Sequence, residues 1–261
     1  MQRRAVAQTG IEVSPLGLGT VKIGRNQGVK YPQNFELPSD KQVRDLLALA
    51  ADLGINLLDT APAYGLSEER LGKLLPGSRH QWVLETKVGE QFTDGQSSFD
   101  FTAAGTRLSV ENSLRRLKTD YLDIVLIHSN GEDERILREE AALDTLLEMK
   151  QQGWIRAVGI SSKTAAGGLL AYALDCDVVM ATYNPVYTDE LPVLEAAAAQ
   201  NRALLVKKAF ASGHLQQFGE DNPIEQALAF VFAQPGTTSV VLGTLNPQHL
   251  RENVHVAQRL L

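Results

Sequence analysis

The sequence has little cysteine: Cys176 is the only one in 261 residues, so an intrachain disulfide is excluded. Its neighbours are largely apolar, which favours a buried, unreactive thiol over a nucleophile. No run of 18 apolar residues is present, so we expect no membrane-spanning helix. Two arginines near the start, Arg3 and Arg4, are not followed by the apolar segment of a signal peptide. We therefore expect a cytoplasmic protein.

Positive charge is also scarce: the chain has 25 Lys and Arg residues and 31 Asp and Glu residues, which gives a net charge of −6. This excess of negative charge argues against nucleic acid or an anionic membrane as the main partner. Apolar residues make up 44% of the chain and charged residues 21%, as is usual for globular proteins. No linker or low-complexity segment divides the chain, so we expect one domain over residues 1–261. No feature indicates how many copies associate.

Several motifs of catalysis and nucleotide binding are missing. The five histidines show no spacing typical of metal ligands, which disfavours metal-dependent hydrolysis; they are His80, His128, His214, His249 and His255. Neither a G-x-S-x-G motif nor a P-loop occurs. Gly17 and Gly19 lack the third glycine and the following helix of a Rossmann fingerprint.

Short apolar segments instead alternate with amphipathic ones along the whole chain. The predicted strands are 16–20, 56–59, 82–87, 123–128, 157–161, 178–183, 203–207 and 239–243. The predicted helices are 40–53, 67–75, 106–118, 134–153, 164–174, 189–200, 222–233 and 247–260. Runs of leucine and β-branched residues suit strands buried on both faces, and the alternation predicts parallel pairing. We expect an α/β fold, a (β/α)8 TIM barrel, with a doubly wound sheet as the alternative.

Three further segments complete the expected fold. Residues 5–13 are predicted to form an N-terminal β-hairpin that turns near Thr9 and Gly10. Residues 24–38 are polar and read as a long loop, and such loops in compact domains are usually functional or mobile. Ser39 or Asp40 is expected to cap the first long helix, and Ser67 the second.

Four polar side chains fall at or just after predicted strand ends. Asp59, Lys87 and His128 end the second, third and fourth strands, and Tyr64 lies in the loop after the second. Each of these residues alone also has a purely structural explanation, because an Asp or Tyr can pack a loop and a Lys side chain is usually solvated. Active-site groups of barrel enzymes lie at the carboxyl ends of strands, so four together favour a catalytic site.

These four groups can together assist hydride transfer to a carbonyl. A phenol is a weak acid with a pKa of about 10. We expect the ammonium of Lys87 to lower the pKa of Tyr64, and Asp59 to keep Lys87 charged. A neutral His128 would hydrogen-bond the carbonyl oxygen. No side chain can supply a hydride, so a nicotinamide cofactor is required.

The motifs EVSPLGLGT, GINLLDTAPAYGLSEERLG, LETK and LDIVLIH carry a resemblance. Over essentially its whole length the sequence resembles the aldo-keto reductase superfamily, as a short bacterial-type member. The resemblance implies Tyr64 as general acid with Asp59, Lys87 and His128 as its partners. It also implies NADPH bound in an extended form across the barrel mouth without a Rossmann fold.

The resemblance also implies a set of cofactor contacts. Positions that match the family are Gly19, Thr20, Val21, Asp59, Ser161, Phe210, Ser212, Gly213, Thr244 and Asn253. Positions that depart from it are Ser162 (usually Asn), Met180 (usually Gln), Lys207 and Lys208 (usually an aromatic residue and Ser), and Gly243 and His249 (usually Lys and Arg). The last two departures remove the clasp for a 2′-phosphate, so NADH stays an alternative to NADPH. Lys207 and Lys208 could supply the missing charge.

The substrate side of the site is expected to be open, because the loop over 212–222 is short. We expect the loop 24–38, the neighbourhood of Trp82 and Tyr187 to shape it. Tyr31 and Phe35 either line the pocket or pack the loop. The favoured function is reduction of a small-molecule aldehyde or ketone. The alternative is a nicotinamide-binding regulatory or sensing protein on the same barrel.

Overall fold

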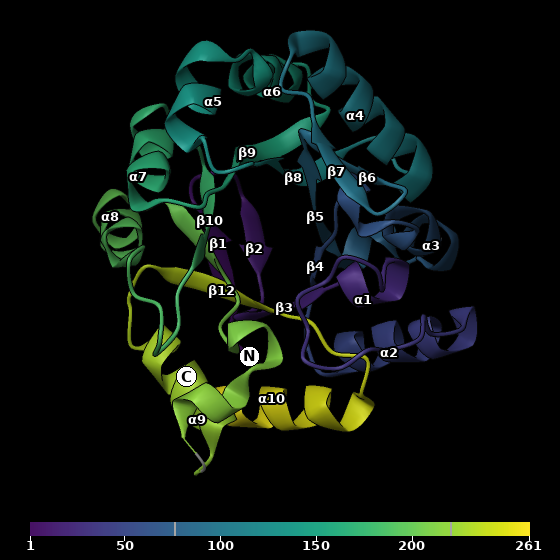
Figure 1. Ribbon diagram of the computed structural model, residues 1–261, viewed down its shortest axis with the longest axis vertical. Helices are drawn as coiled ribbons and strands as arrows, with labels where there is room; N and C mark the ends of the chain where they lie inside the picture. Colours follow the sequence, from purple (N-terminus) through teal and green to yellow (C-terminus); the bar gives the residue numbers. More distant parts are fainter. Residues whose placement is uncertain (76, 220) are drawn as a thin grey trace.

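Parallel strands close into a barrel in the computed structural model, which describes residues 1–75, 77–219 and 221–261 (Figure 1). Within those residues the barrel has eight strands, in the order β3 (Leu16–Gly19), β4 (Leu57–Asp59), β5 (Val83–Val88), β8 (Leu122–His128), β9 (Ile155–Ser161), β10 (Val178–Thr182), β11 (Ala203–Lys207) and β12 (Thr237–Leu242). β12 pairs with β3, with Val240 opposite Leu16, and this closes the ring. The predicted barrel is confirmed, and the doubly wound alternative is wrong.

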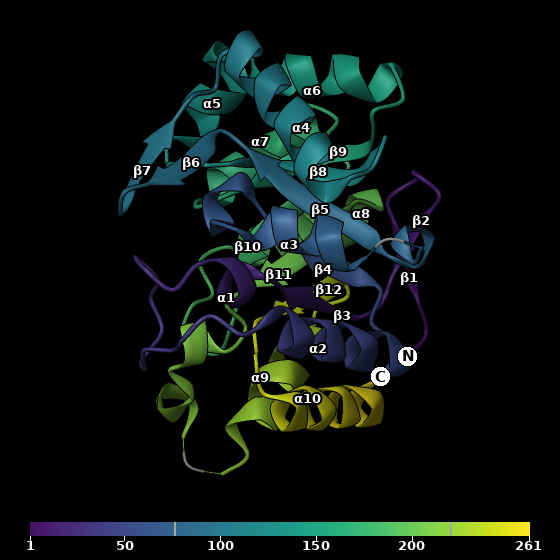
Figure 2. The same cartoon turned by 90° about the vertical axis from the view of Figure 1, so that its right-hand side faces the viewer.

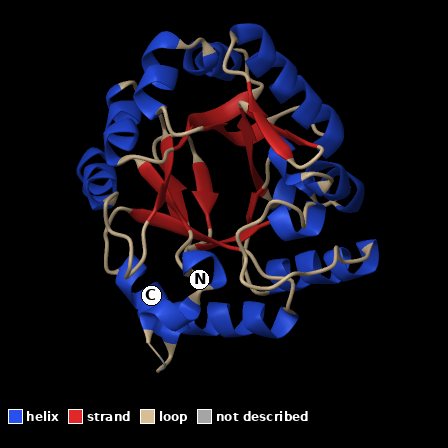
Figure 3. Cartoon of the chain, in the orientation of Figure 1, coloured by secondary structure: helices blue, strands red, loops and turns tan. Residues whose placement is uncertain are grey.

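Helices surround the strands on all sides (Figure 3). They are α1 (Val21–Gly24), α2 (Asp40–Asp52), α3 (Ser67–Leu74), α4 (Ala103–Leu117), α5 (Asp133–Glu139), α6 (Ala142–Gln151), α7 (Ala165–Ala173), α8 (Leu191–Gln200), α9 (Pro223–Phe232) and α10 (Pro247–Leu260). The helix predicted over 134–153 is two helices, because Glu140 adopts an extended conformation between α5 and α6. Ser39 caps α2 in a capping box with Gln42, as predicted.

Two apolar layers hold the barrel together, because successive side chains of a strand point to opposite faces. In β8, Ile124 and Leu126 point into the barrel, whereas Val125 and Ile127 pack against the helices. Cys176 is buried in the outer layer, where burial raises the pKa of its thiol to about 12. The expectation of an unreactive thiol is thereby supported. None of the helices in the described part of the chain has the length and apolar character that a bilayer crossing requires.

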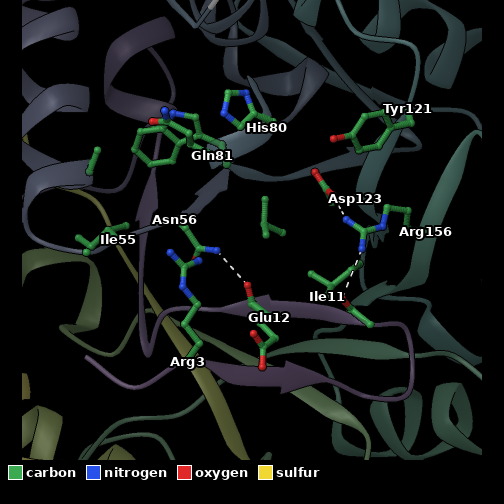
Figure 4. Close-up of a pocket in the computed structure, with 15 residues that line it drawn as sticks. Arg3, Ile11, Glu12, Ile55, Asn56, His80, Gln81, Tyr121, Asp123 and Arg156 are labelled. Carbon is green, nitrogen blue, oxygen red and sulfur yellow. Dashed lines mark hydrogen bonds and ion pairs between the residues drawn. The ribbon is translucent and has the colours of Figure 1, made fainter. Parts of the chain in front are cut away.

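An N-terminal hairpin closes the end of the barrel where the strands begin. β1 (Arg4–Val6) and β2 (Ile11–Val13) pair antiparallel, as predicted, and their buried side chains join the inner apolar layer. Asn56 fixes the hairpin by donating to the Glu12 carbonyl at 2.9 Å (Figure 4). Trp82 lines the groove at this end. The expectation that Trp82 helps to shape the substrate pocket is therefore wrong, because Trp82 directly precedes β5 and lies at the end of the barrel where the strands begin.

A second hairpin, which was not predicted from the sequence, lies at the other end of the barrel (Figure 2). β6 (Glu90–Thr93) and β7 (Gln96–Phe99) pair antiparallel and follow β5 directly. Asp94 and Gly95 form the turn with positive φ angles of 51° and 81°. An Asp-Gly pair is the preferred sequence for such a two-residue turn, so a signal was present.

Gly24 at the end of α1 is a position where a side chain would collide with the backbone of the loop that carries Tyr64. A Cβ there would lie 2.1 Å from the Tyr64 carbonyl oxygen and 2.3 Å from the Ser67 amide nitrogen. We expect Gly24→Ala to lower the free energy of unfolding by about 3 kcal/mol or more, because backbone atoms must move. Gly54→Ala is the control, since Gly54 has φ +84° and open space around it, and should lose only about 1–2 kcal/mol. Urea unfolding measures both; equal losses would contradict the prediction.

Candidate active site

The four side chains singled out from the sequence meet at the end of the barrel that carries the β6–β7 hairpin. Asp59 and His128 are the last residues of β4 and β8, and Lys87 is the penultimate residue of β5. Tyr64 ends the short 3-10 helix η1 (Pro62–Tyr64) that follows β4. All four line one groove with a volume of about 920 Å³, which is within the range of known ligand pockets.

Buried hydroxyl groups fix the loop that carries Tyr64. Thr20 donates to the Asp59 carbonyl at 2.7 Å, and its hydroxyl lies 2.7 Å from that of Ser67. Thr60 also donates to Ser67, at 2.9 Å. The expected capping role of Ser67 is wrong, because it is the first residue inside α3 and its hydroxyl points to these threonines. Ser67 instead ties the strand ends to the start of α3.

Lys87 lies between two acidic side chains inside the barrel. Its ammonium forms an ion pair with Asp59 and donates to the Thr60 carbonyl at 2.9 Å. It also donates to Glu85 at 3.2 Å. Glu85 was not predicted, although the period of a strand places it on the same face as Lys87, two residues earlier. The side chains of Lys87 and Glu85 are 1% and 0% exposed, so water screens these charges little.

Burial and mutual contact divide the protons between these groups. Burial would lower the pKa of Lys87, but Asp59 and Glu85 together raise it well above its usual value. Burial would also raise the pKa of Asp59, yet Lys87 and the hydrogen bond with Glu85 lower it. Burial is the main reason why the pKa of Glu85 is raised well above its usual value, with Asp59 adding to it. The two acids therefore shift in opposite directions: Asp59 favours the carboxylate that pairs with the ammonium, and Glu85 favours keeping its proton.

The pKa of Tyr64 shifts in the direction opposite to the one predicted from the sequence. Lys87 lies 5.0 Å from the centroid of its ring and lowers the pKa, as expected. Burial and the Asp59 carboxylate outweigh this effect, so the pKa of Tyr64 is raised above its usual value. The predicted net lowering is wrong because the sequence gives the neighbouring charge but not the degree of burial. Tyr64 is consequently a phenol, able to donate a proton, throughout the neutral range.

His128 stands edge-on to Tyr64, with ring centroids 6.3 Å apart and an angle of 86° between the planes. Its Nδ1 lies 2.7 Å from a carboxylate oxygen of Glu90 in β6. Burial lowers the pKa of His128 and outweighs the opposite effect of Glu90. At neutral pH the imidazole is uncharged, as the sequence reading expected.

The structure gathers most of the remaining predicted residues around the same groove. Those that line it are Gly19, Val21, Ser161, Met180, Lys207, Lys208, Phe210, Ser212, Gly213 and Gly243, together with Tyr31 and Tyr187. Those outside the lining are Thr20, Ser162, Thr244, His249 and Asn253. Phe35 packs edge-on against Tyr31 and is outside the lining too.

Lys207, which replaces the usual aromatic residue, belongs to a chain of hydrogen bonds. Its ammonium donates to the Ser161 hydroxyl at 2.9 Å and to the Ser162 carbonyl at 2.6 Å. The hydroxyl of Ser162 donates to Glu190 at 2.9 Å. Burial lowers the pKa of Lys207 to about 8. Lys207 is thus engaged at the base of the groove, and it offers no ring face for stacking.

Lys208 differs from its neighbour. It has a left-handed backbone, with φ +56°, and its ammonium makes no hydrogen bond to the described residues. Burial and then the nearby charges of Lys30 and Lys163 lower its pKa. Together these three lysines give the groove a basic rim on a protein of net charge −6. Across the residues that the structure describes, no group of three or more His, Cys, Asp or Glu side chains is arranged to bind a metal.

The buried ion pair predicts a large effect on stability. We expect Lys87→Met to lower the free energy of unfolding by about 3–5 kcal/mol at pH 7, because Asp59 would be buried without its partner. The difference in free energy of unfolding between the native protein and Lys87→Met should become smaller toward pH 4. The pKa of Asp59 is lowered in the folded protein, so the stabilisation that its carboxylate provides is lost as pH falls. The control is Lys41→Met, which removes the exposed Lys41–Asp45 pair and should change stability by less than about 0.5 kcal/mol. Denaturant unfolding measures both; a loss independent of pH would contradict this account.

Comparison with known proteins places the chain in a family. The Aldo/keto reductase family model matches residues 15–226. A crystal structure of a Pseudomonas aeruginosa protein assigned to the aldo-keto reductases is 50% identical, covers 99% of this chain and 95% of its own, and has a TM-score of 0.90. The uncharacterized oxidoreductase YqkF of Bacillus subtilis is 27% identical over 98% of this chain and 91% of its own length. The aldo-keto reductase YhdN of the same organism is 39% identical over 62% and 47%. The chain belongs to the aldo-keto reductase family and is an NAD(P)H-dependent oxidoreductase.

Proposed function

We propose that the protein reduces an aldehyde or ketone to an alcohol, with Tyr64 as the proton donor and NADPH as the source of hydride. The observation that carries this proposal is the buried ammonium of Lys87 beside a protonated phenol at an accessible groove. Such a pair can deliver a proton to a carbonyl oxygen and stabilise the phenolate that remains. Asp59 keeps the ammonium charged and aimed.

The residues present fit a nicotinamide dinucleotide. Asn253 in α10 has a buried Oδ1 without a hydrogen-bond partner among the described residues, and a bound adenosine group would satisfy it. The rim of Lys30, Lys163 and Lys208 suits the phosphates. Gly19 and Gly243, with no side chains, leave room for close approach. When bound, the cofactor supplies the hydride.

The residues of the chain then divide the remaining work. Tyr64 donates its proton to the carbonyl oxygen as negative charge develops there. Lys87 stabilises the resulting phenolate, and Asp59 and Glu85 hold Lys87 in place. His128 lines the same groove, where its imidazole can contact the substrate. Tyr31 and Tyr187 line the space for the substrate, and their phenol rings suit a small molecule with an apolar body.

Removing the hydroxyl of Tyr64 tests the proton donor. We expect Tyr64→Phe to lower kcat for 4-nitrobenzaldehyde by about 10²–10⁴-fold, because the general acid is lost. NADPH consumption measured by absorbance gives the rate, and NADH is measured separately to compare the two cofactors. Cofactor affinity, followed by protein fluorescence, should change little and serves as the control.

The other outcomes of that experiment are equally informative. Unchanged turnover in the variant would show that Tyr64 is not the donor. A native protein that binds the cofactor but reduces no carbonyl across a wide panel would favour the sensing protein over the reductase. Lys207 in place of the aromatic residue that stacks on the nicotinamide is the feature that makes this alternative worth testing.

The preference for NADPH is proposed to depend on Lys208. We expect Lys208→Ala to raise the Kd for NADPH by about tenfold, because one charge-assisted contact with phosphate is lost. The Kd for NADH should rise less if Lys208 contacts the 2′-phosphate. Lys41→Ala, a distant lysine already paired with Asp45, is the matched control. Unchanged NADPH affinity in Lys208→Ala would refute this role.

We also propose a cytoplasmic location. The single cysteine is buried and makes no disulfide, which suits a reducing compartment. Fractionation of cells that produce the protein at natural levels would test the proposal, and recovery outside the cytoplasm would overturn it.

A further inference from the structure

Glu90 is an acidic residue of the site that no sequence motif indicated. It is the first residue of β6, and its two carboxylate oxygens have different partners. One lies 2.7 Å from Nδ1 of His128, and the other accepts a hydrogen bond from Ser97 in β7 at 2.6 Å. The β6–β7 hairpin, which stands at this end of the barrel (Figure 2), therefore brings a carboxylate to His128.

The hairpin that carries Glu90 is anchored to the rest of the barrel mouth. The guanidinium of Arg25 lies 3.9 Å from the centroid of the Phe92 ring in β6. The same guanidinium donates to the Ala63 carbonyl in the Tyr64 loop at 2.9 Å. Arg25 thus links the hairpin that carries Glu90 to the loop that carries Tyr64.

The two nitrogens of His128 have different surroundings. Nδ1 is buried and meets no partner except Glu90 in the described residues, at an angle outside that of a linear hydrogen bond. Nε2 is neither hydrogen-bonded nor among the buried unpaired atoms, so it is reachable from the groove. Five charged or titratable groups lie around the imidazole: Glu90 from β6, Lys87 from β5, Lys207 from β11, Asp59 from β4 and Tyr64 from η1.

The charge of Glu90 decides where the imidazole proton sits. Burial would raise the pKa of Glu90, but the contact with His128, the hydrogen bond from Ser97 and the charge of Arg25 lower it to about 2, so the carboxylate is ionised. An ionised oxygen 2.7 Å from a bare nitrogen would set two lone pairs against each other. The proton of a neutral His128 therefore belongs on Nδ1. Nε2 is then an acceptor, and it becomes a donor only when the ring carries both protons.

We propose that Glu90 is a positioning residue that holds the proton of His128 on Nδ1, so that Nε2 donates to a substrate carbonyl only in the imidazolium form. This inference rests on the proposed carbonyl reduction, and it revises the expectation that a neutral His128 donates to the carbonyl. The neutral form instead accepts a hydrogen bond from an alcohol hydroxyl. The protonated form of His128 thereby favours binding of the carbonyl, and the neutral form favours binding of the alcohol.

The direction of the pH effect follows from the environment of His128. Burial lowers the pKa of His128 below the usual 6.5. The imidazolium form therefore becomes populated only at a pH below 6.5. Glu90 opposes this lowering. Loss of the carboxylate charge should consequently move the titration of His128, and the rise in kcat/KM for carbonyl reduction, to lower pH.

Long-range proton–nitrogen NMR of ¹⁵N-histidine protein tests the inference without turnover. His128→Gln identifies the signals. We expect the native protein to show the Nδ1–H tautomer above the pKa, and Glu90→Gln to lower that pKa by about one unit. Asp94→Asn is the matched control, since it removes one charge from the turn of the same hairpin and Asn tolerates the positive φ there. It should leave both the tautomer and the pKa unchanged.

Each outcome bears on a different claim. A native Nε2–H tautomer, or a Glu90→Gln titration equal to that of the native protein, would overturn the role of Glu90 whatever the enzyme activity. The pH profile of kcat/KM should shift in Glu90→Gln by the same amount as the NMR titration, with the control unshifted. If the NMR shift is found but no carbonyl is reduced by the native protein, the pairing stands and the proposed reaction fails.

Discussion

The ion pair between Lys87 and Asp59 is the constraint around which this barrel mouth is built. An ammonium that is almost wholly buried is stable only if opposite charge and hydrogen-bond acceptors surround it. β4 supplies Asp59, the loop directly after it supplies the Thr60 carbonyl, and β5 supplies Glu85. The register between β4 and β5, with Asp59 opposite Glu85, brings the two acids to one ammonium. Burial and the Asp59 carboxylate raise the pKa of Glu85, because two buried carboxylates beside a single cation would leave excess negative charge.

The groups around this pair are placed by loops that are themselves held by buried contacts. The hydroxyls of Thr20, Thr60 and Ser67 fix the loop of Tyr64, while Arg25 links that loop to the β6–β7 hairpin. The hairpin in turn presents Glu90 to His128. The phenol and the imidazole therefore face one another from separate elements with little freedom, which is the preorganisation that proton transfer requires.

The part of the groove around Lys207 shows how the structure accommodates a residue that departs from the family pattern. Lys207 occupies the position of an aromatic residue, yet its ammonium is bound to Ser161 and Ser162, with Glu190 completing the chain of contacts. Lys208, next in sequence, points its charge to the rim instead. Two adjacent lysines thus have different environments, because the strand ends between them and the backbone turns left-handed.

The sequence by itself determined the barrel and the meeting of Asp59, Tyr64, Lys87 and His128 at its mouth. Both depend on local patterns: apolar runs define the strands, and polar residues at the ends of parallel strands must come to one edge. The contacts of Glu85 and Glu90, the site of Trp82 and the raised pKa of Tyr64 were decided by the tertiary structure. Each depends on which strands and turns lie beside one another and on how much water is excluded, and no segment of the chain encodes that alone.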